Sequence, residues 1–258
     1  MKEIVCVTGS HGFLGTHLVK GLEMAGYEVV AGDREGNVSR GISYFVDLAS
    51  YGNLHGQDDE LEIYEANVTR VKRILRRLYK YTSVKGVIFT SSSSVTLPIL
   101  TPYAKAKKEM ETLVGDWSNL LPVVITRPYT MYGVGDKQHL TPLIFDSCLN
   151  GTPLTLDPTP THDYVWVNDV VGAYLDLLFN AKELSGSIVE LGTGIPTSNA
   201  ELVLRIEQVT GKKANITGFT SGLREYDVKD WYCKNPYLKA FTPLGVGLTN
   251  IYEDIKGT

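Results

Sequence analysis

Near its start the chain reads Thr8-Gly9-Ser10-His11-Gly12-Phe13-Leu14-Gly15, with glycines at the spacing G-x-x-G-x-x-G. A short β-branched run at 4–8 precedes the glycines, and Leu14, Leu18 and Leu22 follow at the spacing of one helix face. Glycine permits a tight turn and lets a helix pack closely on the strand before it. The stretch therefore predicts a strand, a glycine turn and a helix, which is how a parallel α/β sheet begins.

Strand-like and helical runs alternate along the rest of the chain, as in a parallel sheet joined by helical crossovers. We expect further strands at 28–32, 44–48, 84–90, 123–126 and 188–191, and helices at 61–79, 103–114, 140–149, 170–179 and 199–209. The expected fold is a doubly wound parallel α/β sheet of the Rossmann type in residues 1–128, with the strand near 188–192 returning to it. Residues 129–258, where Pro and Gly are more frequent, are expected to form mostly a small C-terminal substrate-binding lobe.

One interval is too short for this pattern. Only residues 34–43 separate the second expected strand from the third. A parallel crossover that includes a helix needs a dozen or more residues. We therefore expect that a strand-and-helix unit at the edge of the sheet, after the second strand, is missing.

The glycine turn also indicates a ligand. It lets the backbone approach a pyrophosphate, and the following helix offers its N-terminal N–H groups to the phosphates. Asp33 ends the next strand, 18 residues after Gly15. A carboxylate there accepts hydrogen bonds from the ribose hydroxyls of adenosine and repels a 2′-phosphate, which favours NAD over NADP. The adjacent Arg34 tolerates a phosphate, so NADP stays open, and the alternative of a purely structural turn with a capping Asp explains less of this context.

A second group of residues indicates acid/base chemistry. Tyr103 and Lys107 lie four residues apart on one helix face, where the ammonium lowers the pKa of the phenol. The row of hydroxyls at 91–94 follows the strand at 84–90, at the edge where open α/β sheets bind ligands. A surface pair on a helix or a polar loop would explain either element but not their order. Tyr103, Lys107 and a hydroxyl from this row are therefore the candidate catalytic residues.

In this order the motifs resemble the short-chain dehydrogenase/reductase superfamily, in particular its extended branch of NAD-dependent nucleotide-sugar epimerases and dehydratases. The resemblance covers nearly the whole chain. Thr8 to Gly15 is similar to the family's TGxxGxxG loop, and Tyr103 with Lys107 to its YxxxK pair. Other matching segments are 92–95 (SxxV), Glu111, 127–133 (RPxxxYG), 163–170 (DYxxVxDV), 190–194 (NxGTG), Arg224 and Asp227.

The resemblance implies a role for each site residue. Tyr103 would be the acid/base, Ser92 would hold the reacting oxygen, and Lys107 would hold the nicotinamide ribose. Residues implied at the cofactor are Gly9, His11, Gly12, Phe13, Leu14, Gly15, Asp33, Arg34, Leu48, Ala49, Asn67, Tyr103, Lys107, Arg127 and Pro128. Residues implied at the substrate are Ser92, Ser93, Thr130, His162 and Arg224.

Missing acids narrow the reaction within this family. The 4,6-dehydratases carry an Asp-Glu pair directly after the Ser/Thr, where this chain has Ser93 and Ser94, and the glutamate of the related decarboxylases is also absent. A 4-epimerase or a 4-keto reductase remains. Asp33 and Asn37 resemble the D-x-x-x-N of 4-epimerases and favour chemistry that retains NAD. An NAD(P)H-dependent keto-sugar reductase is the alternative; a non-enzymatic dinucleotide-binding protein would normally lack the Tyr or the Lys.

The chain also departs from the family near the substrate. Tyr103 follows Ser92 by only eleven positions, which predicts a more open sugar pocket. Thr130 stands where many members have an asparagine, and His162 where an arginine commonly grips the nucleotide diphosphate. A mostly neutral histidine binds phosphate less well. Arg224 alone would then bind the diphosphate, or the substrate is a related sugar without a nucleotide.

The composition limits which classes of partner the protein is expected to bind. The net charge of −4 and the pI near 5.8 argue against nucleic-acid binding, and the chain has no run long enough to span a membrane and no signal-peptide pattern. The three cysteines and five histidines show no metal-binding spacing. We expect a cytoplasmic protein without a metal site. The basic run at 70–80 reads as a solvated helix face, and the resemblance implies a homodimer through the helices near 61–80 and 103–116.

Overall fold

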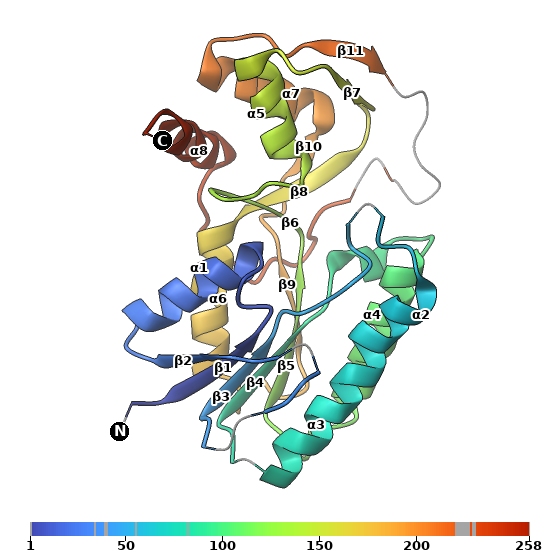
Figure 1. Ribbon diagram of the computed structural model, residues 1–258, viewed down its shortest axis with the longest axis vertical. Helices are drawn as coiled ribbons and strands as arrows, with labels where there is room; N and C mark the ends of the chain where they lie inside the picture. The colour runs from blue at the N-terminus through green and yellow to red at the C-terminus, as the bar shows by residue number, and fades with distance from the viewer. Residues whose placement is uncertain are drawn as a thin grey trace. The chain divides into compact units, whose positions relative to one another are not determined.

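The computed structural model describes residues 2–33, 35–38, 41–54, 56–81, 83–219, 228 and 231–257 (Figure 1). The chain divides into two compact units. The first consists of Met1–Thr96, Leu100–Pro128 and Val170–Glu190, and the second of Leu97–Ile99, Tyr129–Asp169 and Leu191–Thr258. By this division Val170–Glu190 belongs to the first unit.

The first unit is built on a six-stranded sheet in the order β2-β1-β3-β4-β5-β9. Its strands are β1 (Ile4–Thr8), β2 (Glu28–Ala31), β3 (Tyr44–Asp47), β4 (Gly86–Thr90), β5 (Val123–Pro128) and β9 (Ile188–Leu191). The pairings among β1 to β5 are all parallel. The chain runs from β1 outward to β2 and then crosses to β3, so the strand order reverses between β1 and β3. This confirms the doubly wound sheet and places its switch point, where such sheets bind ligands, beside the glycine turn.

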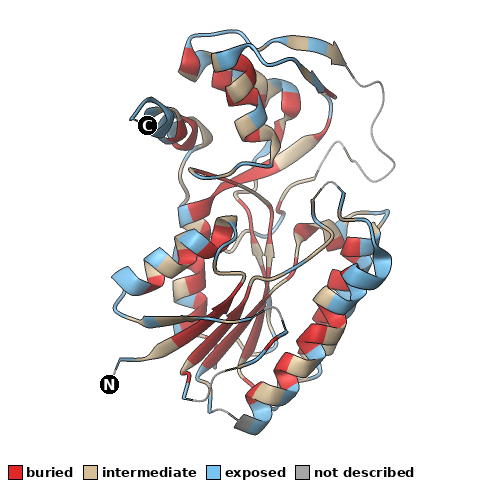
Figure 2. Ribbon diagram, viewed as in Figure 1, coloured by how far each residue is buried: buried red, intermediate tan, exposed pale blue. Residues whose placement is uncertain are grey.

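Helices cover both faces of this sheet. Figure 1 shows α1 (Phe13–Met24) and α6 (Val167–Phe179) on one face, and α3 (Arg70–Tyr81) and α4 (Pro102–Gly115) on the other. Under α3 and α4 lies a core that includes Phe45, Phe89, Ile74 and Met110, all at most 1% exposed. The strands at its centre are buried over most of their length (Figure 2), as expected for a parallel sheet covered on both sides.

The edge unit is missing, as predicted. β2 is the outer strand, and the residues described between β2 and β3 form neither helix nor strand. The short connection packs onto α3 instead. Gly36 has a φ of +75°, an added Cβ would lie 2.6 Å from Ile74 Cγ1, and Arg77 Nη1 donates to the Gly36 carbonyl at 2.7 Å. Glycine is required there because the turn has a left-handed backbone and leaves no space for a side chain.

The expected helix at 61–79 is a composite. It starts as α2 (Glu60–Tyr64), capped by Asp59, whose carboxylate accepts from the Leu61 and Glu62 N–H groups. It then passes through a π-helical turn, η1 (Glu65–Thr69), into α3. The π turn was not predicted, because one extra residue per turn leaves little mark on an apolar stripe; such turns are frequent at functional sites.

In its described residues, the second unit has two small sheets and three helices of its own. β10 (Pro196–Ser198), β8 (Thr161–Trp166) and β6 (Thr130–Tyr132) form one sheet, and β11 (Ile216–Phe219) pairs with β7 (Leu154–Leu156). The helices are α5 (Leu140–Asn150), α7 (Asn199–Thr210) and α8 (Leu244–Gly257). None of the helices in the described part of the chain has the length and apolarity needed to cross a membrane.

Candidate active site

The glycine turn has the geometry of a phosphate cradle. Gly9 has a φ of +63°, and an added Cβ would lie 2.9 Å from the Ala49 nitrogen. At Gly15 a Cβ would lie 2.1 Å from the Gly9 carbonyl oxygen, so neither position accepts a side chain. Gly12 is the N-cap of α1 and provides no side-chain cap, which leaves the first-turn N–H groups to a ligand. The predicted cofactor residues from Gly9 to Gly15 therefore fit the pyrophosphate of NAD.

Asp33 follows β2, at the same carboxyl edge of the sheet as the glycine turn after β1. Its carboxylate accepts hydrogen bonds from the backbone N–H of Asn37 at 2.7 Å and from its Nδ2 at 2.5 Å. Partial burial raises the pKa of this carboxyl, but the hydrogen bonds from Asn37 and from the N–H groups of Glu35 and Gly36 outweigh it and lower the pKa overall. The ionised Asp33 carboxylate thus binds Asn37, the last residue of the D-x-x-x-N pattern, and closes the shortened connection between β2 and β3. Arg34, predicted beside it, lies outside the described residues.

The three predicted catalytic residues meet in the first unit. Ser92 follows β4, and Tyr103 and Lys107 lie in the first two turns of α4. Burial raises the pKa of Tyr103 to about 12, while hydrogen bonds with Ser50 and Ser92 act to lower it. The Lys107 Nζ lies 5.8 Å from the centre of the Tyr103 ring and donates to the Thr90 carbonyl at 2.8 Å. The arrangement combines an acid/base phenol, a hydroxyl donor and an ammonium.

Two further serines complete this cluster. Ser50 was missed from the sequence, and Ser94, part of the row of hydroxyls at 91–94, was not predicted as a site residue. Ser50 follows β3 and hydrogen-bonds with the Tyr103 phenol. Ser94 donates to Ser92 Oγ from its hydroxyl at 2.9 Å and from its N–H at 3.2 Å. Because Ser92 Oγ accepts both bonds, its own proton is directed to the Tyr103 phenol oxygen. The signal that could have found Ser50 is its place at the carboxyl edge of a strand, the same signal that identified Ser92.

Lys107 is almost completely buried, at 4% exposure. Burial lowers its pKa to about 8. The carboxylates of Asp47 and Glu111 act against burial, whereas the nearby Arg70 guanidinium adds to it. The two carboxylates therefore stabilise the charged form of Lys107, which burial destabilises.

Arg127 was predicted at the cofactor, and its guanidinium contacts carboxylates. Its Nε and Nη2 donate to Glu111 at 2.8 and 2.7 Å, and its Nη1 lies 3.4 Å from Glu190. The fork links α4, β5 and β9, so it fixes the helix that carries Tyr103 and Lys107. Pro128 ends β5 directly after it.

Asn67 is fully buried in the π-helical turn. Its Nδ2 donates to the carbonyls of Tyr51 and Ile63 at 2.7 and 2.8 Å, and within the described part of the chain its Oδ1 has no hydrogen-bond partner. Leu48 and Ala49 follow β3, where the Ala49 N–H donates to Thr8 Oγ1 at 3.3 Å. Ser93 is 2% exposed in a short 3-10 turn, η2 (Ser93–Thr96).

The other predicted substrate residues belong to the second unit. Thr130 opens β6, and His162 lies in the paired strand β8 with its ring edge-on to Tyr164 and Trp231. Beside it the buried Asp163 accepts hydrogen bonds from the N–H groups of Thr193, Gly194 and Cys233 and from the Thr193 hydroxyl, at 2.7–3.0 Å. The Asp of the DYxxVxDV stretch therefore anchors the glycine loop after β9. Arg224 and Asp227 lie outside the described residues.

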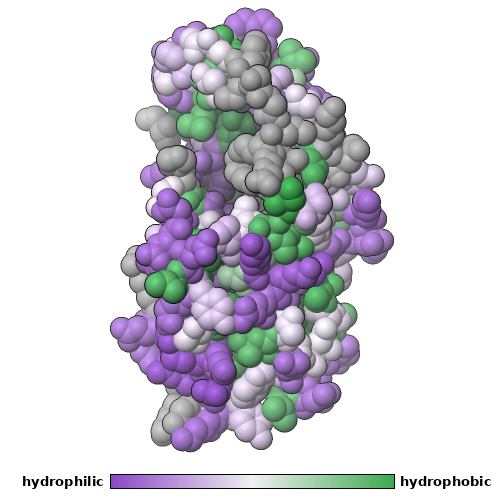
Figure 3. Space-filling model, turned by 90° about the vertical axis from the view of Figure 1, so that its right-hand side faces the viewer, coloured by the Kyte–Doolittle hydropathy of each residue, from purple (hydrophilic) through white to green (hydrophobic). Residues whose placement is uncertain are grey.

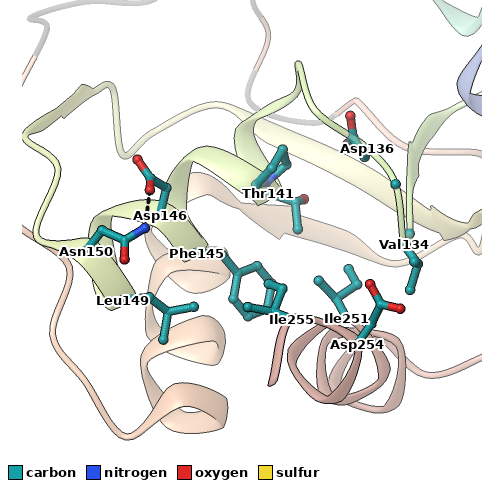
Figure 4. Close-up of a pocket in the computed structure, with 13 residues that line it drawn as sticks. Val134, Asp136, Thr141, Phe145, Asp146, Leu149, Asn150, Ile251, Asp254 and Ile255 are labelled. Atoms are coloured by element: carbon teal, nitrogen blue, oxygen red, sulfur yellow. Dashed lines mark hydrogen bonds between the residues drawn. The ribbon is translucent and has the colours of Figure 1, made fainter. Parts of the chain in front are cut away.

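The second unit also contains a cavity of about 210 Å³ (Figure 4). The loop 133–136 and helices α5 and α8 line it with apolar side chains, among them Phe145 and Ile251, and with Asp136, Asp146 and Asp254. None of the predicted site residues that the structure describes lines it. Among the described residues, no group of three or more His, Cys, Asp or Glu is arranged to hold a metal ion.

Comparisons with known proteins agree with this geometry. UDP-glucose 4-epimerase of Bos taurus is 25% identical over 99% of this chain and 96% of its own length. CDP-abequose synthase of Salmonella typhimurium is 26% identical over 80% of this chain and 81% of its own length. The solved structure of MoeE5 in complex with UDP-glucuronic acid and NAD superposes with a TM-score of 0.86 at 25% identity, covering 98% of this chain and 99% of that one.

The family model described as the NAD dependent epimerase/dehydratase family matches residues 5–56 and 38–192. This match spans well over half of the chain and includes the glycine turn, Ser92, Tyr103 and Lys107. The chain belongs to the NAD dependent epimerase/dehydratase family.

Proposed function

We propose that the protein is an NAD-dependent nucleotide-sugar epimerase that inverts the sugar at C4. The observation that carries the proposal is the cluster of Ser92, Tyr103 and Lys107 at the carboxyl edge of the sheet whose glycine turn fits a pyrophosphate. The complex of MoeE5 with a UDP-sugar and NAD, on the same fold, supports it.

In this reaction Tyr103, as phenolate, accepts the proton of the C4 hydroxyl while hydride leaves C4, which becomes a ketone. NAD held by the glycine turn and Asp33 would supply the hydride acceptor. When the sugar is bound, Ser92 turns its proton from the Tyr103 phenol to the C4 oxygen and holds that oxygen near Tyr103. After the keto sugar turns over, hydride returns to its other face and Tyr103 gives the proton back, so no cofactor is consumed. Lys107 keeps the phenolate accessible by its positive charge.

The residues after Ser92 support epimerisation over elimination of water. Ser93 and Ser94 occupy the positions of the dehydratase acids, and Ser93 is buried with its carbonyl accepting from the Thr96 hydroxyl. A serine hydroxyl has no useful acidity for elimination, and Ser94 is used to orient Ser92. Asp33, ionised and close to the glycine turn, favours NAD over NADP as the retained cofactor.

An NAD(P)H-dependent keto-sugar reductase is the second candidate, because Ser92, Tyr103 and Lys107 equally serve a single hydride transfer. The two are separated by denaturing the purified protein and identifying the released nucleotide by chromatography. The epimerase proposal expects about one NAD per chain. An empty site, with rapid oxidation of added NADPH by a 4-keto sugar, would support the reductase instead. Tyr103→Phe is the matched control: it should retain NAD and lose turnover.

We also propose a homodimer through the helices near 61–80 and 103–116. Figure 3 views the side that carries α3 and α4, which is mostly hydrophilic with scattered hydrophobic side chains. Leu61, Tyr64 and Tyr79 on these helices are 83%, 45% and 57% exposed. Acidic residues gather at the start of the composite helix and basic ones at its end, so two antiparallel copies would bring opposite charges together (Glu60 and Glu62 with Lys72 and Arg76). Sedimentation equilibrium tests this, since a monomer at all concentrations contradicts it.

A further inference from the structure

A buried ion pair lies beside the catalytic cluster. Asp47, the last residue of β3, and Arg70, the first of α3, are each 4% exposed. Arg70 Nη1 and Nη2 donate to the two Asp47 carboxylate oxygens at 2.8 and 2.9 Å. Arg70 also donates from Nη2 to the Ala49 carbonyl at 2.7 Å and from Nε to the Ala66 carbonyl at 3.0 Å. The whole fork is thus engaged with β3, the segment after it, and the π-helical turn.

A pair buried to this degree is weak evidence for stability, because the loss of hydration offsets most of the attraction. Its contacts indicate what it positions. Asp47 accepts from the hydroxyl of Thr8, and Thr8 Oγ1 in turn accepts from the Ala49 N–H. Thr8 directly precedes Gly9, where an added Cβ would lie 2.9 Å from the Ala49 nitrogen. The pair therefore ties the segment 47–49 to the glycine turn at the switch point of the sheet.

The same pair acts on Lys107. The charged groups that influence its ammonium are Asp47 from β3, Arg70 from α3 and Glu111 from α4, and its other contacts are the Thr90 carbonyl of β4 and the Tyr103 ring. Glu111 is paired with Arg127, which also reaches Glu190. Six buried or half-buried groups of alternating sign thus follow one another, with no net formal charge: Arg70, Asp47, Lys107, Glu111, Arg127 and Glu190.

We propose that Asp47 and Arg70 are positioning residues of the catalytic centre, which set the charge around Lys107 and hold the segment 47–49 against the glycine turn. They act on the reaction indirectly, through Lys107 and through the backbone of the segment 47–49. The inference rests on the proposed role of Lys107. A lysine at position 70 would not reproduce it, because one ammonium cannot bond both Asp47 oxygens and the Ala49 carbonyl as a planar fork does.

The test follows the ionisation of Lys107 directly. Protein labelled with ¹³C at the lysine ε-carbons is titrated by NMR, and Lys107→Arg assigns the Lys107 signal. Wild type, Asp47→Asn, Arg70→Gln and the double variant are compared without substrate. The exposed pair Glu65–Arg73 on the same composite helix provides the matched control, as Glu65→Gln with Arg73→Gln.

Opposite shifts are expected. Asp47→Asn removes a negative neighbour and lowers the midpoint of Lys107 by about one pH unit, whereas Arg70→Gln removes a positive one and raises it by about as much. The double variant should lie between them, and the surface control should not move. Equal midpoints in wild type and both single variants, or shifts in the same direction, would overturn the proposal. A purely structural role gives no reason for opposite signs.

If a single variant does not fold, Arg70→Lys and the charge-neutral double variant decide the question by their affinity for NAD⁺, measured calorimetrically. Both should bind about tenfold more weakly than wild type, because the segment 47–49 is no longer fixed; wild-type affinity in both would refute the proposal. Lys107 titrates whether or not a sugar is turned over. Unshifted midpoints in an active epimerase would therefore remove this inference alone, and shifted midpoints in an inactive protein would remove only the proposed function.

Discussion

At the scale of single residues, burial moves two pKa values toward the neutral forms. The pKa of Tyr103 rises to about 12 and that of Lys107 falls to about 8. Sugar oxidation needs the opposite forms, a phenolate beside an ammonium. Hydrogen bonds with Ser50 and Ser92 lower the pKa of Tyr103, and the carboxylates of Asp47 and Glu111 raise that of Lys107. In the proposed reaction these neighbours stabilise the charged forms of both residues against desolvation.

Ser92→Ala tests this balance. With the pKa of Tyr103 near 12 and that of Lys107 near 8, the reactive pair of phenolate and ammonium is a minor form. Its fraction should rise with pH up to about 8, where Lys107 begins to lose its proton, and then stay level until Tyr103 titrates. Removing the hydrogen bond from Ser92 raises the pKa of Tyr103, so activity should fall over this whole range while the bend near pH 8 stays in place. We expect kcat to fall by about 10²–10³-fold, as for loss of an oxyanion donor. A pH–rate profile with wild-type rates, or one whose bend near pH 8 moves, would contradict the role given to Ser92.

Gly15→Ala tests the glycine turn. Its Cβ would meet the Gly9 carbonyl oxygen at 2.1 Å, and backbone on both sides leaves little room to adjust. We expect a loss of about 1–3 kcal/mol in the free energy of unfolding, together with loss of NAD binding. Gly172→Ala in α6 is the control, since an added Cβ there meets nothing within 4 Å, and it should stabilise by about 1 kcal/mol. Urea unfolding separates the two.

The sequence predicted those site residues whose partners are close in the chain or whose motifs follow one another in the order typical of the family. Tyr103 and Lys107 share a helix face, and Ser92 follows the preceding strand. Ser50 and the Asp47–Arg70 pair were not found. Asp47 and Arg70 are 23 positions apart and meet only when the helix after β3 folds back onto the sheet.

At the scale of elements, α4 is the one on which the chemistry depends. Thr101 caps it by accepting from the Ala104 N–H at 3.2 Å, and Pro102 occupies its first turn. Thr101→Ala should therefore cost about 1 kcal/mol of stability, and kcat should fall while NAD affinity changes little, because the first turn carries Tyr103. Thermal unfolding and steady-state kinetics check both. Thr101→Ser should restore both values, and a variant as stable as wild type would contradict the capping role.

Most elements of the first unit were predicted within a few residues, because its buried strands and amphipathic helices have strong periodic patterns. The predicted and observed bounds of β1 and β9 coincide. In the second unit the strands β6, β7 and β10 have three residues each, too few to show an alternation, and none was predicted. The helix α8 was also missed.

At the scale of the whole chain, the loss of an edge unit leaves the switch point intact. The sheet ends at β2, and the shortened connection is closed by Asp33, Asn37 and Gly36 against α3. The length of the interval after Asp33 predicted this loss. The way the connection closes was not predictable, since it depends on Arg77 and Ile74, about 40 residues later.

The most direct test of the central claim is a ¹H NMR screen of nucleotide sugars incubated with the purified protein and no added cofactor. The H3–H4 coupling distinguishes the two C4 epimers. The account predicts that at least one sugar is converted to an equilibrium mixture with its C4 epimer, and that Tyr103→Phe, with NAD still bound, converts none. No C4 inversion of any sugar by the wild-type protein, or unchanged inversion by Tyr103→Phe, would contradict it.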